Sequence, residues 1–139
     1  MSATPKQSPI VVLGAGSWGT ALAILLARNG ATVRLWDRNP QHVGLLQQEF
    51  CNNRYLPGIP FPANLKIVTE FKEAVTGVED IFIAVPSYGF KSILDQIHAV
   101  CSNNVRIAWG TKGIDPNTHQ LLHQSVQALF GEIPVNSIS

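Results

Sequence analysis

Short unbroken apolar runs alternate along this chain with longer stretches in which apolar residues return at helical spacing. The run Ile10–Leu13 is rich in β-branched residues and has no polar break, which is typical of a strand buried on both faces. The stretch after it has the period of an amphipathic helix and ends at Gly30, a residue type that commonly stops a helix. We expect the inward face of this helix to carry Ala21, Leu22, Leu25 and Leu26.

The same alternation continues to the end of the chain. Further strands are predicted at Thr32–Trp36, Lys66–Thr69, Asp80–Val85, Val105–Trp109 and Val135–Ile138. The predicted helices are one capped by Asn39 and Pro40 with Val43, Leu46 and Phe50 inward, then Phe71–Thr76, Phe90–Val100 and Asn117–Phe130. The stretch Asn52–Leu65 contains three prolines and is predicted to be an irregular loop, and loops of this length are often functional. Strands alternating with helices indicate an α/β fold with a mainly parallel sheet.

Three glycines, Gly14, Gly16 and Gly19, lie where the first strand should turn into the first helix. In this context the G-x-G-x-x-G spacing indicates a dinucleotide-binding turn in a doubly wound, Rossmann-type sheet. The first glycine permits the tight turn, the second removes the Cβ between backbone and diphosphate, and the third lets the helix pack closely. The free N–H groups at the helix start would hold the phosphates. A glycine-rich turn without a ligand is the simpler alternative.

Three other glycine motifs are excluded by single residues. A P-loop has Lys after its last glycine, where this chain has Thr20. A protein-kinase loop has Val two places after it, where this chain has Ala21. A nucleophile elbow around Ser17 needs glycine at the position of Ala15. We therefore interpret Ser17 as a phosphate-side contact rather than a nucleophile.

Asp37 and Arg38 follow the second predicted strand, about 20 residues beyond the glycines. An acidic residue there usually binds the ribose hydroxyls of NAD, whereas an arginine pairs with the extra phosphate of NADP. Both are present, so the sequence leaves the cofactor preference open. In the long loop, Arg54 and Tyr55 are able to meet a nucleotide, and the equal alternative is that Tyr55 packs the loop onto the core.

Later strand ends bring more polar residues to the same edge of the sheet. Pro86, Ser87 and Tyr88 follow one strand, and open α/β sheets bind ligands beyond the carboxyl ends of their strands. Lys112 lies between two glycines after the next strand and is well placed to reach an anion. A plain surface lysine is the common alternative at that position.

Composition narrows the classes of function. The formal net charge of +1 argues against nucleic acid or a membrane surface as the main partner, and no apolar run is long enough to span a membrane. Cys51 and Cys101 match no metal or redox spacing and favour a reducing, cytoplasmic location. His119 and His123 lack the glutamate of the metalloprotease pattern, so no metal site is expected, and His42 has no evident partner.

Five distinct motifs occur in order along the chain: GAGSWGTALA from Gly14, RYLPG at Arg54–Gly58, AVPS at Ala84–Ser87, TKGI at Thr111–Ile114 and the closing VNSIS. With them, the sequence resembles bacterial NAD(P)-dependent glycerol-3-phosphate dehydrogenase over Ile10–Ser139. Residues 1–9 lack the apolar core of a signal peptide and are expected to form a flexible tail, and the resemblance implies a dinucleotide-binding domain over residues 10–139. It implies truncation before a helical C-terminal domain that supplies the catalytic lysine, most of the substrate pocket and a homodimer interface. The fragment alone is then expected to be inactive.

The resemblance also implies an activity and a set of site residues. The activity is hydride transfer between sn-glycerol 3-phosphate and NAD or NADP, giving dihydroxyacetone phosphate and supplying glycerol phosphate for phospholipid synthesis. Cofactor contacts are implied for Gly14, Gly16, Ser17, Trp18, Gly19, Arg38, Tyr55 and Lys112, and substrate contact for Lys112. Asp37 departs from the family pattern, in which this position is often small or neutral. Another two-domain dehydrogenase, of the 2-hydroxyacid or ketopantoate type, and a non-catalytic NAD(P) sensor are the alternative functions.

Overall fold

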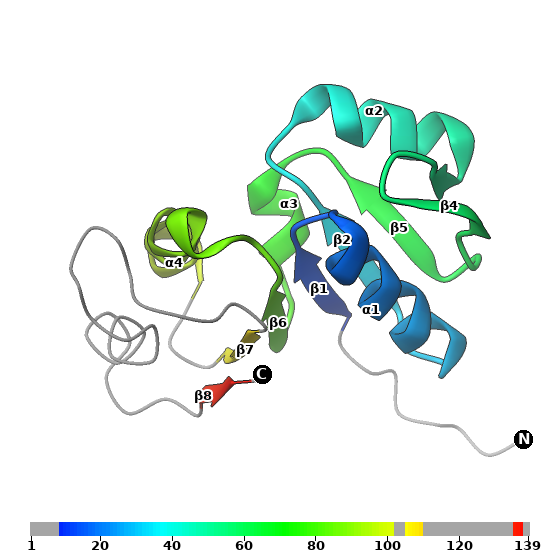
Figure 1. Cartoon of the computed structure of the whole chain (residues 1–139). Helices are drawn as coiled ribbons and strands as arrows, with labels where there is room; N and C mark the ends of the chain where they lie inside the picture. The colour runs from blue at the N-terminus through cyan, green and yellow to red at the C-terminus, as the bar shows by residue number, and fades with distance from the viewer. Residues whose placement is uncertain (1–8, 102–104, 110–134, 138–139) are drawn as a thin grey trace, which may run out of the picture.

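The computed structural model describes residues 9–101, 105–109 and 135–137 (Figure 1). Its strands are β1 (Ile10–Leu13), β2 (Val33–Trp36), β3 (Cys51–Asn52), β4 (Leu56–Pro60), β5 (Leu65–Val68), β6 (Asp80–Ile83), β7 (Arg106–Trp109) and β8 (Val135–Ser137). Its helices are α1 (Ser17–Arg28), α2 (Pro40–Glu49), α3 (Phe71–Val75) and α4 (Ser87–Val100). Six of the strands form one sheet in the order β5-β2-β1-β6-β7-β8, and β3 pairs with β4 in a separate ribbon.

The order of strands in the sheet reverses beside β1. From β1 the chain steps outward to β2 and β5, then returns to β6 on the other side of β1 and continues to β7 and β8. All these neighbours are parallel, and Ile10 of β1 is in register with Val33 of β2 and Asp80 of β6. Such a reversal leaves a crevice at the carboxyl ends of β1 and β6. The predicted doubly wound, mainly parallel Rossmann-type sheet is confirmed.

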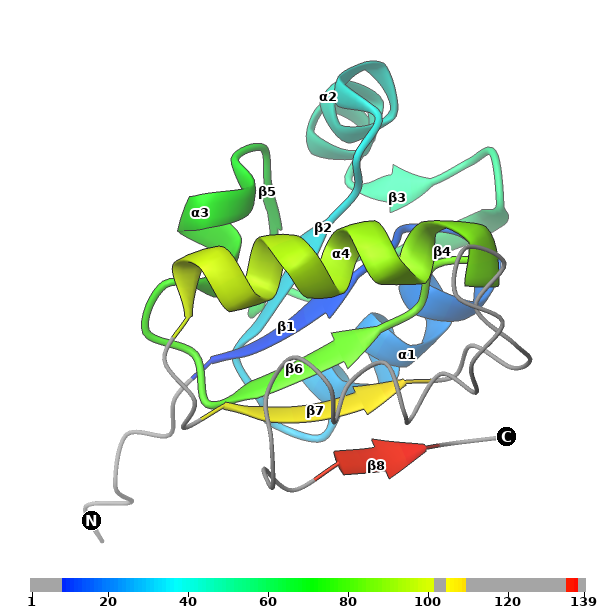
Figure 2. The same ribbon diagram turned by 90° about the vertical axis from the view of Figure 1, so that its left-hand side faces the viewer.

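Helices cover both faces of the sheet. Figure 2 shows α4 running across one face, with α1 on the opposite face. The core under α1 contains Val12 and Ile24, and the core under α3 and α4 contains Val11 and Phe90. Because Val11 and Val12 point into different cores, β1 is buried on both sides, as its unbroken apolar run predicts.

The predicted inward stripe of α1 is wrong for Ala21 and Leu25 and only partly right for Leu22 and Leu26, because the helix is rotated relative to it. Leu25 is 56% exposed and Ala21 is exposed, while Leu22 and Leu26 are half-buried at the edges of the contact. The buried face consists instead of Gly19, Thr20, Ala23, Ile24 and Ala27. Mostly small side chains let the helix approach the sheet, and the larger leucines flank this contact.

The predicted irregular loop Asn52–Leu65 contains regular structure. The strands β3 and β4 pair antiparallel, with Cys51 opposite Pro60. Both strands of a two-stranded ribbon are edge strands, and an edge strand tolerates proline where its N–H would face away from the partner. The prediction failed because it treated proline as incompatible with any strand.

Phe50 was predicted to point inward, and it is 71% exposed. The helix α2 ends at Glu49, and Phe50 adopts a left-handed conformation with φ of 56° that leads the chain into β3. A residue that leaves the helical path no longer follows the helical period. The other two inward positions, Val43 and Leu46, are buried as predicted.

The remaining predictions on element positions are close to the structure. The strands of the main sheet begin or end within two residues of the predicted bounds, and α4 begins at Ser87 rather than Phe90. The predicted helix Asn117–Phe130, residues 1–8 of the predicted tail and Ile138 lie outside the described residues. Within the described ranges, no helix has the length and apolar character needed to cross a membrane.

Candidate functional site

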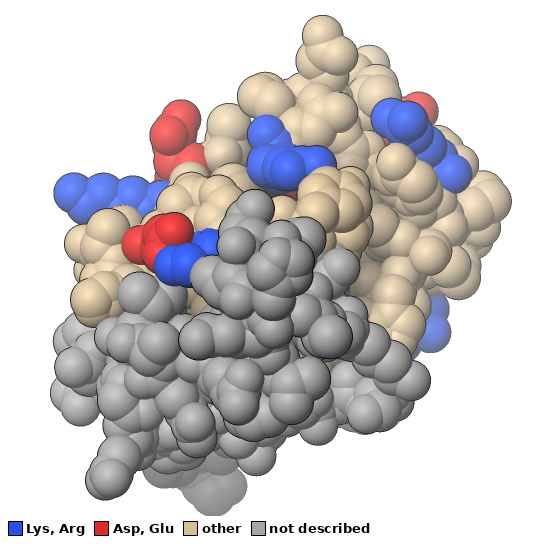
Figure 3. All heavy atoms as spheres, turned by 60° about the vertical axis from the view of Figure 1, so that its left-hand side comes forward, with Lys and Arg blue, Asp and Glu red and all other residues tan. Residues whose placement is uncertain are grey.

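A cleft of about 650 Å³ opens at the carboxyl ends of β1 and β6, where the strand order reverses. Its walls are formed by residues 14–19, residues 37–39, His42, Arg54, Tyr55, residues 84–86 and the first turns of α4. On the described part of the face in Figure 3, Lys and Arg side chains stand as separate groups, several with an acidic group beside them. The lining of the cleft combines backbone turns with a few charged side chains and the aromatic rings of Trp18, Tyr55 and Tyr88.

The three glycines of the turn differ in what surrounds them. A Cβ on Gly14, whose φ is +116°, would lie 2.7 Å from the carbonyl oxygen of Ala84. A Cβ on Gly19 would overlap the carbonyl oxygen of Gly14. Among the described residues, and apart from its two chain neighbours, no atom lies within 4 Å of the Cβ position of Gly16. Gly14 and Gly19 are thus required by packing, whereas Gly16 leaves open space on the cleft side.

The helix α1 starts at this cleft without a side-chain cap among the described residues. Its N-cap is Gly16, which has no side chain, and no side-chain hydrogen bond caps the helix. The N–H groups of Ser17, Trp18 and Gly19 have no carbonyl partner within the helix, as in the first turn of any α-helix. Together with the positive end of the helix dipole, they form a site suited to an anion.

Trp18 stands at one side of the helix start and is 48% exposed. Its ring centroid lies 5.0 Å from that of Phe82 on β6, and the two rings are tilted by 34°. The indole is therefore supported by the sheet on one side. An exposed aromatic ring beside a cleft offers a flat apolar surface to a ligand.

The main chain of Ala15, in the middle of the turn, is bound by three side chains. Its N–H donates to Asp37 Oδ1 at 2.9 Å. Its carbonyl oxygen accepts from His42 Nε2 at 2.8 Å and from Asn52 Nδ2 at 3.0 Å. His42 and Asn52 are 5% and 1% exposed, so these are buried hydrogen bonds. No partner for His42 could be predicted from the sequence, and nothing in the sequence pattern singled out Asn52.

Asp37 and Arg38 sit at the end of β2, as predicted. Besides Ala15, the Asp37 carboxylate accepts the N–H of Asn39 at 3.0 Å through Oδ2. The Arg38 guanidinium carbon lies 5.5 Å from the centre of the Tyr88 ring, which is 61% exposed. Arg38 is thus held against an aromatic face at the mouth of the cleft, where it presents a planar cation.

Tyr55 lines the cleft from the segment between β3 and β4. Its ring lies edge-on to His42, with 5.3 Å between centroids, and the Arg54 guanidinium carbon lies 5.1 Å from its centre. Tyr55 is 42% exposed, so part of the ring packs on the protein and part is open to the cleft. Packing of Tyr55 against the protein is thus observed, and its contact with a nucleotide stays a prediction.

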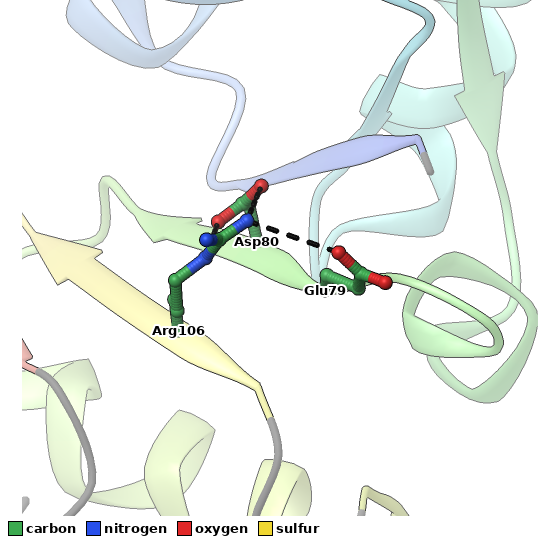
Figure 4. A network of polar contacts seen from close by, with 3 residues as sticks. All are labelled: Glu79, Asp80 and Arg106. Carbon is green, nitrogen blue, oxygen red and sulfur yellow. Dashed lines mark hydrogen bonds and ion pairs between the residues drawn. The ribbon is translucent and has the colours of Figure 1, made fainter. Parts of the chain in front are cut away.

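Ionic contacts at the opposite end of the sheet are separate from this cleft. Figure 4 shows Arg106 of β7 reaching Asp80 of β6, with Glu79 beside them. Arg106 Nε lies 2.7 Å from Asp80 Oδ1, and the hydrogen bond and charge of Asp80 raise the pKa of Arg106. These residues are at or beside the amino ends of their strands, so this exposed group is a strand-to-strand contact. Among the described residues, no cluster of three His, Cys, Asp or Glu side chains could hold a metal ion.

The structure brings most of the predicted site residues together around one cleft. Those that line it are Gly14, Gly16, Ser17, Trp18, Gly19, Arg38 and Tyr55. Lys112 lies outside the described residues, and its part in the site stays a prediction. Sequence reasoning missed His42 and Asn52, because the Ala15 carbonyl oxygen that both of them bind is distant from them in the sequence.

Comparison with known proteins gives a consistent result. A profile described as NAD-dependent glycerol-3-phosphate dehydrogenase N-terminus matches residues 9–139. The glycerol-3-phosphate dehydrogenase (NAD(P)+) of Coxiella burnetii is 47% identical over 135 residues, which cover 97% of this chain and 40% of that protein. The enzyme of the same name from Legionella pneumophila is also 47% identical over 135 residues, which cover 96% of this chain and 40% of that protein.

A solved structure agrees with these relatives. The crystal structure of glycerol-3-phosphate dehydrogenase from Coxiella burnetii matches with a TM-score of 0.91 and 47% identity. The match covers 96% of this chain and 41% of that one. The chain therefore spans about two fifths of the length of the curated relatives it matches.

Proposed function

The chain belongs to the NAD-dependent glycerol-3-phosphate dehydrogenase family, whose N-terminal part it matches, and on this premise we propose that it binds the NAD(P) cofactor of such an enzyme. The diphosphate of the cofactor is assigned to residues 14–19. The uncapped start of α1 beside the open position of Gly16 is the observation that carries this assignment. A phosphate would take the place of the missing cap and interact favourably with the helix dipole. A cleft of about 650 Å³ is also of the size that cofactor sites have.

The adenosine end of the cofactor is assigned to the end of β2. Arg38, already held over Tyr88, presents a cation that can stack on adenine or pair with the 2′-phosphate of NADP. The Asp37 carboxylate uses one N–H on each oxygen, which leaves acceptor capacity on both for a ribose hydroxyl of NAD. The described residues therefore fit NAD and NADP alike.

The nicotinamide end is assigned to the side of the cleft formed by Trp18 and the carboxyl end of β6. Trp18 is fixed there by its contact with Phe82 and remains 48% exposed. Lys112 is proposed to touch both the nicotinamide and the phosphorylated substrate, on the basis of the family resemblance. That lysine follows β7, the strand next to β6.

We propose that the complete enzyme transfers a hydride between sn-glycerol 3-phosphate and NAD(P), with dihydroxyacetone phosphate as the other product. The bound cofactor supplies the hydride donor or acceptor. The residues of this chain bind and orient it, and no catalytic acid or base is assigned to the described residues. The proposal includes a cytoplasmic location, a small phosphorylated substrate as the partner, and a supply of glycerol phosphate for phospholipid synthesis.

Binding is tested by titrating the purified chain with NADH and with NADPH, followed by nicotinamide fluorescence. We expect saturable binding that ADP reverses, because ADP carries the diphosphate and adenosine. A chain that binds neither dinucleotide would overturn the proposed cofactor site. Equal binding of both would mean that Asp37 and Arg38 offset each other.

Activity is tested with the full-length protein. We expect NADH or NADPH oxidation with dihydroxyacetone phosphate and little with unphosphorylated dihydroxyacetone. Oxidation with ketopantoate or a 2-keto acid instead would indicate another two-domain dehydrogenase. Dinucleotide binding without oxidation by any of these substrates would indicate a sensor.

A further inference from the structure

The peptide groups on both sides of Ala15 are fixed by residues that follow β2. Asp37 accepts the Ala15 N–H at 2.9 Å, so the peptide between Gly14 and Ala15 cannot rotate without losing a hydrogen bond. His42 and Asn52 both donate to the Ala15 carbonyl oxygen, at 2.8 and 3.0 Å. A carbonyl oxygen only accepts, so His42 must carry its proton on Nε2. Two donors use both lone pairs of that oxygen.

The orientation of the Ala15 carbonyl determines the direction of the next N–H group. In a trans peptide, the C=O of one residue and the N–H of the following residue point in opposite directions. With the Ala15 oxygen held by His42 and Asn52, the Gly16 N–H points away from these two side chains. A rotated peptide would instead present a carbonyl oxygen where the N–H now stands, and an oxygen repels an anion.

We propose that Asn52 and His42 are positioning residues, which hold the Gly16 N–H and the first turn of α1 in the orientation that binds the cofactor diphosphate. This inference rests on the proposed function. Neither residue needs to touch the cofactor in order to act. Groups that are oriented before the ligand arrives bind it without the cost of ordering them.

Asn52 also joins the turn to the segment that carries Tyr55. Its Nδ2 donates to Thr20 Oγ1 at 2.8 Å as well as to Ala15, and its Oδ1 accepts the N–H of Tyr55 at 3.2 Å. Thr20 is fully buried and Asn52 is 1% exposed. One buried amide therefore sets the position of the phosphate turn, of α1 and of the Tyr55 main chain together.

Asn64 offers a matched control at the other end of α1. Its Nδ2 donates to the carbonyl oxygens of Ala27 and Ala31, both at 2.7 Å. Asn64 is half-buried rather than fully buried, but like Asn52 it ties α1 to a neighbouring segment through two hydrogen bonds from its amide, and it does not line the cleft. If such an asparagine acts on stability alone, replacing Asn52 or Asn64 by alanine should have the same effect on cofactor affinity.

The first experiment compares Asn52→Ala with Asn64→Ala in the full-length protein. Thermal unfolding and the dissociation constants of NADH and ADP are measured for both. We expect both variants to melt at lower temperature, and only Asn52→Ala to weaken NADH and ADP binding, by about tenfold. Equal affinity in the two variants would overturn the proposal. A loss for NADH without a loss for ADP would also overturn it, because the defect would then lie away from the diphosphate.

A second pair of variants at His42 keeps the test decisive if Asn52→Ala fails to fold. His42→Phe keeps an aromatic ring against Tyr55 but has no donor, whereas His42→Gln keeps an N–H donor near the position of Nε2. We expect His42→Phe to weaken ADP binding several-fold and His42→Gln to restore most of it. The reverse order would show that the ring contact matters and would overturn the positioning role. A wild-type protein that binds neither NADH nor ADP would refute the proposed function itself, a result distinct from all of these.

Discussion

The carbonyl oxygen of Gly14 occupies the space where a Cβ on Gly19 would stand. The end of β1 and the start of α1 therefore meet backbone to backbone, with no side chain between them. A side chain at residue 19 must push the helix away from the strand or distort the turn. This contact makes the glycine at 19 a requirement of packing, independent of any ligand.

We predict that Gly19→Ala lowers the free energy of unfolding by about 1–3 kcal/mol, the usual cost of overpacking. Gly44→Ala is the control, because Gly44 lies in α2 and, in the part of the chain that the structure describes, only the backbone of its own helix comes within 4 Å of its Cβ position. Alanine is the better helix former, so the control should be more stable than wild type by about 0.5–1 kcal/mol. Urea unfolding measures both. Equal stability of the two variants would contradict the predicted clash.

Gly16→Val should separate binding from stability. Gly16 has φ of −80° and open space around it, so a side chain fits the folded backbone, and we expect a stability loss of no more than about 1 kcal/mol. The same side chain would stand in the space assigned to the diphosphate. NADH and ADP should then bind at least about tenfold more weakly, because a loss of about 1.4 kcal/mol in binding free energy lowers affinity tenfold. Unchanged affinity by fluorescence titration would remove the diphosphate from this turn.

Arg38→Gln should change the ratio of NADPH to NADH affinity. If Arg38 pairs with the 2′-phosphate, losing this charged contact costs NADPH about 1.5–3 kcal/mol, roughly ten- to a hundredfold in affinity, and NADH much less. Arg28→Gln, at the far end of α1, is the charge-matched control and should leave both affinities alone. If both dinucleotides lose affinity equally, Arg38 acts on the shared adenosine rather than on the extra phosphate.

Alkaline pH should reduce stability through Cys101. Burial raises the pKa of this thiol above its ordinary value of 9.0, so the folded protein keeps the proton at a pH where the unfolded chain has lost it. The unfolded state then binds fewer protons, and stability falls as pH rises beyond about 9. Urea unfolding at increasing pH should show a smaller alkaline loss in Cys101→Ala than in wild type. Equal losses in the two proteins would mean that Cys101 does not contribute.

The features that could be predicted from the sequence are those set by residues close together along the chain. The apolar runs located the strands of the main sheet, and Asn39 caps α2 as expected by accepting the N–H of Gln41 at 3.0 Å. The glycine spacing located the turn, and the rule that ligands meet the carboxyl ends of parallel strands placed Tyr88 on the same edge as the glycine turn. These features are local in sequence or follow from sheet topology.

The failures concern contacts that only the folded chain creates. The inward face of α1 follows from how closely it approaches β1, and leucine spacing alone carries no information on that distance. His42 and Asn52 bind Ala15 across 27 and 37 residues of sequence, and no local pattern marks either of them as a partner of the turn. Phe50 was misplaced because the last residue of a helical period can already belong to the turn that ends it.

Both the N–H and the carbonyl oxygen of Ala15 are bound by side chains, and this has a consequence for how the protein folds. A peptide that ended at Gly30 would contain every glycine of the turn, yet it would lack all three side chains that orient the Ala15 main chain. During synthesis the turn can reach its final geometry only once the chain has emerged as far as Asn52 and that segment has docked. For the same reason, a glycine motif transplanted into another scaffold would keep its sequence but lose the side chains that orient its N–H groups.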